Sequence, residues 1–87
     1  MTLSDKHYAL IKSLDNRTCL CSFVNTHRHP YAPMFYSDTF RSYWILNALE
    51  FNPPARIVDV EILETDSQII ITTCNAGSII VTYIFTR

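Results

Sequence analysis

The chain has 87 residues, of which 48% are hydrophobic and 17% are charged, and its formal net charge is −1. This length fits one domain, and the near-neutral charge argues against a general nucleic-acid binder, which needs a basic surface. No apolar run reaches the ~18 residues of a membrane span. Soluble proteins usually carry about 25% charged residues. We therefore expect part of the apolar surface to face a partner or a second copy of the chain.

The cysteine count and the first residues indicate a compartment. The segment Met1-Thr-Leu-Ser-Asp-Lys6 lacks a charged region followed by an apolar run, so no secretory signal is expected. Three cysteines, an odd number, do not suit a disulfide framework. We therefore expect a cytoplasmic protein with reduced thiols and no contact with a membrane.

The first predicted element is a helix over residues 3–15. Ser4 has the position of an N-cap, and Leu10, Ile11 and Leu14 recur on one face. Residues 15–17 then form a turn, in which Asn16 can adopt left-handed geometry.

Residues 18–25 predict a strand because apolar and polar side chains alternate, although imperfectly. Residues 26–36 carry two prolines and no helical period, so they predict an irregular loop with room for a short strand at 33–36. Residues 38–51 predict a second helix with Ser37 as its N-cap. One stripe of that helix is apolar or aromatic over most of its length and consists of Phe40, Tyr43, Trp44, Asn47 and Phe51.

Residues 56–86 organise the rest of the chain. Three runs rich in Ile, Val, Thr, Tyr and Phe are separated by polar breaks at 65–68 and 75–77, which predicts a three-strand antiparallel meander. In the first run Val58, Val60 and Ile62 should point inward. Gly77 is expected at the left-handed position of the second turn.

Neither face of the last two meander strands carries a charge. A sheet with one wet face should alternate apolar with charged side chains. Helices packed on one face leave the other face only lightly polar, so that other face needs a cover. The loop at 26–36, a second protomer and a target protein are the three alternatives.

These elements predict a single α+β domain over residues 1–87. The expected fold is a four-stranded antiparallel sheet with two helices on one face, in the order α-β-α-β-β-β. The strand at 18–25 can pair at either edge of the meander, and the sequence leaves this choice open.

Cys19, Cys21, His27 and His29 form the most suggestive group of metal-ligand types. Zinc accepts two thiolates and two imidazoles, but its structural sites place two to four residues between the cysteines and this chain has one. We therefore predict no metal and no cofactor, with the two thiols buried as small apolar groups. Cys74 is also expected in the core. A zinc-stabilised module remains an alternative.

The chain contains none of the short motifs that position a nucleophile, a phosphate or a catalytic metal. A Cys–His pair could still form in the fold, but no local signature supports it, and we predict that the protein is not an enzyme. His27, Arg28, His29 and Tyr31 combine basic and stacking groups, which leaves single-stranded nucleic acid as an alternative ligand.

The preferred prediction is protein binding. The segment 29–36 presents aromatic side chains and a methionine on a backbone stiffened by proline, and interfaces are enriched in such residues. Small domains without a catalytic constellation are often inhibitors or adaptors encoded by viruses or mobile elements, which block a host protein complex. A homodimer through a sheet face or edge is a further expectation. The predicted contact residues are Arg28, Tyr31, Met34, Phe35, Tyr36 and Arg41.

Overall fold

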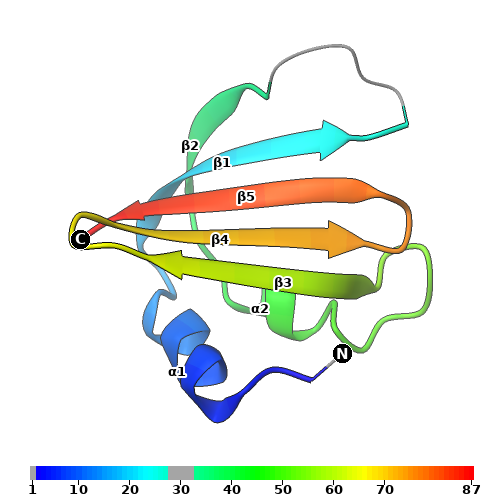
Figure 1. The fold of residues 1–87 in the computed structure, drawn as a ribbon, viewed down its shortest axis with the longest axis horizontal. Helices are drawn as coiled ribbons and strands as arrows, with labels where there is room; N and C mark the ends of the chain where they lie inside the picture. Colours follow the sequence, from blue (N-terminus) through cyan, green and yellow to red (C-terminus); the bar gives the residue numbers. More distant parts are fainter. Residues whose placement is uncertain (1, 28–32) are drawn as a thin grey trace.

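The computed structural model describes residues 2–27 and 33–87. Two helices and five strands lie within these residues. The elements are, in chain order, α1 (Asp5–Ser13), β1 (Thr18–Asn25), β2 (Phe35–Thr39), α2 (Tyr43–Leu46), β3 (Ile57–Glu64), β4 (Gln68–Asn75) and β5 (Ile79–Thr86). Figure 1 shows the strands side by side in the order β2-β1-β5-β4-β3, and every neighbouring pair is antiparallel.

The prediction of four strands and of the order α-β-α-β-β-β is wrong, because residues 35–39 form a strand. Ser37 and Asp38 belong to β2, where Asp38 lies opposite Cys19 of β1. The second helix is therefore only four residues long, and Ser42 is its N-cap in place of Ser37. Ser, Asp and Thr are weak helix formers, and pairing with β1 outweighs the helical pattern of the residues that follow.

The meander prediction is confirmed over β3, β4 and β5. The strand at 18–25 is confirmed with its predicted bounds, and it pairs with β5. It is not an edge strand, however, because β2 lies on its outer side. The edges of the sheet are β2 and β3.

The helices and the segment after β2 cover one face of the sheet. Phe40 is fully buried there and makes edge-to-face contacts with Tyr83 and Phe85, with ring centroids 5.3 and 5.1 Å apart. α1 contributes Ile11 and Leu14 to the same core, as its sequence predicted. The other core residues are Cys19, Cys21, Ile45, Ile57, Ile69 and Ile71. In contrast, Tyr43 and Phe51 of the predicted apolar stripe are more than half exposed.

Hydrogen bonds tie the turn after α1 to the start of α2. The Asp15 carboxylate accepts from the Ser42 N–H at 2.6 Å and from the Ser42 hydroxyl at 2.9 Å. These two bonds lower the pKa of Asp15, with the backbone N–H having the larger effect. Asn16 adopts the expected left-handed geometry, with φ of 68°. The two segments that cover the sheet are thus fixed to each other as well as to the core.

Two details of the meander differ from the prediction. Ser78, not Gly77, takes the left-handed conformation, because the turn closes by a 3.0 Å bond from the Ser78 N–H to the Asn75 carbonyl oxygen. A register shift between Ile57 and Asp59 leaves Val58 half exposed, while Val60 and Ile62 pack against the core as expected. No helix of the described residues is long and apolar enough to cross a membrane.

Candidate functional site

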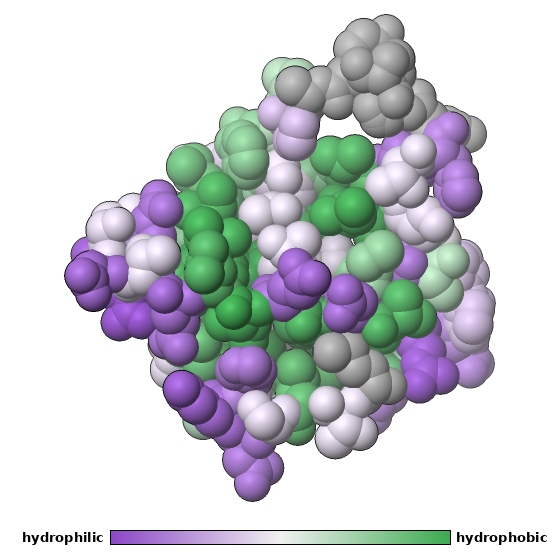
Figure 2. Space-filling view, viewed as in Figure 1, coloured by the Kyte–Doolittle hydropathy of each residue, from purple (hydrophilic) through white to green (hydrophobic). Residues whose placement is uncertain are grey.

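Within residues 2–27 and 33–87, no segment covers the face of the sheet opposite the helices. In the view of Figure 1, β1, β5, β4 and β3 are seen unobstructed from this side. Figure 2 shows the same face, where hydrophobic side chains gather in two groups over the sheet with a paler band between them. We call this surface the open face. Its aliphatic side chains are Leu20, Val24, Leu63, Ile70, Ile80 and Ile84, all half-buried or exposed.

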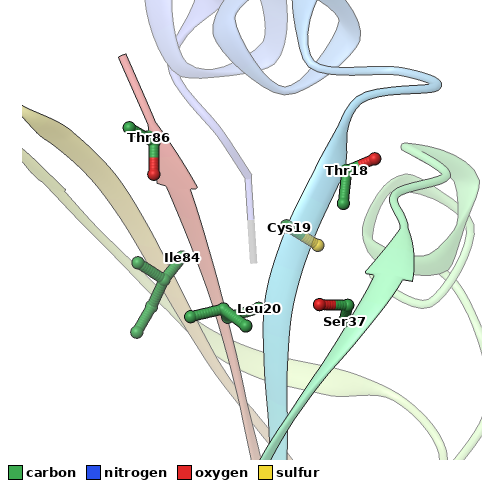
Figure 3. A pocket seen from close by; sticks show the side chains of 6 residues that line it. All are labelled: Thr18, Cys19, Leu20, Ser37, Ile84 and Thr86. Atoms are coloured by element: carbon green, nitrogen blue, oxygen red, sulfur yellow. The ribbon is translucent and has the colours of Figure 1, made fainter.

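Two shallow hollows lie on the open face. One has a volume of about 160 Å³ and is lined by residues of β1, β2 and β5. Figure 3 shows Leu20 of β1 between Ile84 of β5 and Ser37 of β2 at this hollow. The second hollow lies between β3 and β4, beside Leu63 and Ile70. Both are lined mainly by aliphatic and hydroxyl groups, and Glu61 is the one charged residue, at the second hollow. This lining suits contact with another largely apolar surface.

A second exposed apolar surface lies at the β2 edge. Met34 is 83% exposed, Phe35 49% and Tyr36 52%. Phe23 of β1 is 58% exposed and directly follows Ser22, the residue that pairs with Phe35. We call Phe23, Met34, Phe35 and Tyr36 the edge patch.

The edge patch wraps around one border of the sheet. Tyr36 lies opposite Cys21, on the face that carries the helices, whereas Phe35 lies opposite Ser22, on the open face. Phe23 shares the face of Cys21, since alternate residues of a strand point the same way. A partner that approaches this border therefore meets aromatic side chains on both faces.

The structure brings together only part of the predicted contact set. Met34, Phe35 and Tyr36 are neighbours on or next to β2 and are exposed. Arg41 is also exposed, but it follows the opposite end of β2, about 20 Å of extended chain away from Met34. Arg28 and Tyr31 lie outside the described residues. Arg41 therefore does not frame the patch.

Phe23 is a member of the patch that sequence reasoning missed. The alternation of β1 places it on the same face as Cys19 and Cys21, which are buried as predicted. The helices do not cover the end of β1 where Phe23 lies. The sequence did show an apolar side chain at the end of a strand, next to a proline-containing loop. It did not show how far the helices extend over β1.

The two cysteines of β1 are close together, with their sulfur atoms 3.3 Å apart. Burial, followed by the hydrogen bond to Cys21, raises the pKa of Cys19 to about 12. Burial also raises the pKa of Cys21. Both side chains are therefore neutral thiols at pH 7, whereas the nucleophilic form of cysteine is the thiolate.

The predicted zinc ligands do not converge in the part of the chain that the structure describes. His27 follows the end of β1, so more than about 13 Å of extended strand separates it from Cys21. His29 lies outside the described residues. Across residues 2–27 and 33–87, no group of three or more His, Cys, Asp or Glu side chains is arranged to hold a metal ion. Cys74 was expected in the core, but it is only half-buried, in register with Ile80 of the open face.

Comparison of the chain with protein-family models, with curated proteins and with solved structures finds no match. The surfaces described above are therefore the features of the molecule from which a function can be inferred.

Proposed function

We propose that this protein is a non-catalytic protein-binding module, an inhibitor or adaptor that docks another protein on its edge patch. The observation that carries the proposal is the exposure of Met34, Phe35 and Tyr36, three consecutive large apolar side chains at an edge strand. Aromatic residues and methionine are enriched at the centres of protein interfaces. Leaving all three in water has a hydrophobic cost that a bound partner removes.

A comparison of the two sheet edges supports β2 as the binding edge. β3 carries Asp59, Glu61 and Glu64 and an irregularity after Ile57, which are features that keep an edge from pairing with other chains. β2 carries one carboxylate, Asp38, and no irregularity in its pairing with β1. The β3 edge is therefore protected against pairing with another chain, and the β2 edge is available for it.

The chemistry of β2 suits a partner that adds a strand. The outer side of β2 has no neighbouring strand among the described residues, so its outward N–H and C=O groups can pair with an extended peptide. Side chains of such a peptide would meet Phe35 on one face and Tyr36 on the other. We therefore expect a partner with an exposed strand or extended segment that carries apolar residues on both sides.

The test is affinity capture with the immobilised protein and two matched variants. Met34→Ser/Tyr36→Ser removes two apolar side chains from the edge patch, and Tyr8→Ser/Phe51→Ser removes two exposed aromatic rings from other parts of the surface. We expect the wild type and the second variant to retain the same partner, and the first variant to lose it. All three proteins should show the same circular dichroism spectrum.

Retention of one identical set of proteins by all three forms would remove the edge patch from the proposal. Turnover of a substrate by the purified protein would contradict the non-catalytic role. For a captured partner, titration calorimetry with Phe35→Ala then measures the contribution of the central ring, and loss of an interface aromatic typically costs 2 kcal/mol or more, or roughly 30-fold in Kd.

A further inference from the structure

The register of the sheet arranges the open face in rows that run across the strands. One row is aliphatic from end to end and consists of Leu20, Ile84, Ile70 and Leu63 on β1, β5, β4 and β3. The next row consists of the hydroxyl residues Ser22, Thr82 and Thr72 and ends on Glu61 of β3. The third row consists of Val24, Ile80 and Cys74 and ends on Asp59 of β3. These rows account for the two hydrophobic groups and the paler band of Figure 2.

This arrangement is complementary to itself. A two-fold axis parallel to the strands, lying in the interface, brings each row opposite its own copy. Aliphatic side chains then meet aliphatic side chains. The hydroxyl groups of Thr72 and Thr82 meet hydroxyl groups with which they can exchange hydrogen bonds.

The acidic groups select this axis over the alternative. Asp59 and Glu61 of β3 are exposed and in register with Cys74 and Thr72 of the open face. An axis across the strands would place β3 against the β3 of the second copy and set like charges against each other, which is unfavourable. An axis along the strands places β3 against β2, whose open-face residues Phe35 and Ser37 carry no charge and lie in the rows of Glu61 and Leu63.

The area of the open face also suits a dimer. Strands spaced about 4.8 Å apart and rising about 3.4 Å per residue give this sheet a plane of roughly 600 Å². Accessible area exceeds this projection because side chains roughen the surface, and a stable interface buries about 800 Å² on each partner. A second copy of the same sheet therefore covers the face without leaving an apolar margin.

We propose that two copies of this chain associate through their open faces, with a two-fold axis along the strands, to form a two-layer sandwich about 10 Å thick between sheets. The helices stay on the outside of the dimer. Phe35 belongs both to the edge patch and to the open face, whereas Phe23 and Tyr36 lie on the face that carries the helices. The dimer is inferred from the cross-strand rows and not from the edge patch, so the inference stands independently of the proposed function.

The experiment measures molar mass by analytical ultracentrifugation over about a 100-fold dilution, because an oligomer's population depends on concentration. Two variants of β1 are compared with the wild type. Leu20→Lys places a charge in the aliphatic row, and Phe23→Lys places the same charge on the opposite face, at a more exposed position. We expect a dimer for the wild type and for Phe23→Lys. Leu20→Lys should raise the dimer Kd roughly 100-fold, because two copies of the lost leucine lie in one interface.

A monomer mass for the folded wild type at every concentration would overturn the dimer, as would an unchanged Kd for folded Leu20→Lys. If Leu20→Lys does not fold, Leu63→Lys serves instead, since Leu63 lies in the same row on an edge strand and is 56% exposed. Partner capture separates the two proposals: Leu20→Lys should keep the partner and lose the dimer, and Phe23→Lys should do the reverse.

Discussion

The two faces of the sheet are built from similar residues and differ in what covers them. On one face Phe85, Ile71 and Phe40 are fully enclosed by the helices and by each other. On the other, Ile84 and Ile70 occupy the adjacent positions of the same strands and remain partly in water. Composition alone therefore does not decide which face is the core. The core forms on one face because the short α2, held in place by its hydrogen bonds, covers that face only.

Replacement of Phe40 by alanine should have the largest effect. Phe40 is fully buried and contacts two aromatic rings of β5, so its loss should cost about 3–5 kcal/mol of unfolding free energy. Phe23→Ala is the matched control, and at a 58% exposed position it should cost under about 1 kcal/mol. Urea denaturation followed by circular dichroism measures both. Similar costs would mean that the two phenylalanines are equally buried in solution.

Two adjacent isoleucines of β4 allow the stability cost of the same substitution, isoleucine to alanine, to be compared on the two faces. Ile71→Ala, on the helix-covered face, should cost about 2–5 kcal/mol. Ile70→Ala, on the open face, should cost about 1 kcal/mol when the protein is dilute, because part of the side chain is already in water.

The cost of Ile70→Ala should rise with protein concentration as the open face becomes covered in the dimer. The cost of Ile71→Ala, measured against the wild type at the same concentration, should not change, because Ile71 lies on the helix-covered face and takes no part in the dimer. Equal costs for the two substitutions in dilute solution would contradict the assignment of the open face.

The hydrogen bonds between Asp15 and Ser42, which join the turn after α1 to the start of α2, should stabilise the fold in a pH-dependent way. The pKa of Asp15 is lowered in the folded protein, so its stabilising effect is complete above the pKa of the unfolded chain and is lost as pH falls through the folded value. Asp15→Asn should therefore be less stable than the wild type at pH 7, and the difference should narrow below about pH 4. A difference that stayed constant into acid would mean that the Asp15 charge does not contribute.

Much of the fold could be predicted because periodicity was strong. The meander has three β-branched runs, and α1 has an N-cap at Ser4 that accepts from the His7 N–H as its sequence indicates. The segment 35–46 could not be predicted, because its residues have a helical apolar period while its first half pairs with β1. Only the partner strand decides between the two outcomes, and pairing between distant strands leaves no mark on the local sequence.

The candidate site was partly predictable for a related reason. The proline-containing segment rich in aromatic residues was the basis for predicting Met34, Phe35 and Tyr36 as contact residues, and all three are exposed. The lack of charge on both faces of β4 and β5 indicated a surface in need of cover. The cross-strand rows could not be predicted, because they depend on the register of four strands and on the insertion of β1 between β5 and β2.

The orientation of the dimer should produce the smallest effect, and opposite charges at one position measure it. In the proposed arrangement Ser37 lies opposite Leu63 of the second copy, and the nearest carboxylate, Glu61, is about 7 Å further along β3, within reach of a lysine side chain. Ser37→Lys should therefore lower the dimer Kd about two- to five-fold at low salt, since each exposed ion pair contributes about 0.2–1 kcal/mol. Ser37→Glu should raise the Kd by a similar factor. Both effects should fade in 1 M salt, where the screening length is about 3 Å.

The signs of the two effects carry the information, because they differ between the two axes. With the axis across the strands, β2 would face its own copy, and either charge would then lie near an identical charge. Lysine and glutamate would both weaken the dimer in that case. If the two substitutions change the dimer Kd in opposite directions, β3 of one copy lies against β2 of the other. If both raise the Kd, the axis runs across the strands and the carboxylates of the two β3 strands face each other. Such a result would require a bound cation or protonated carboxyl groups at Asp59 and Glu61 to keep the dimer together.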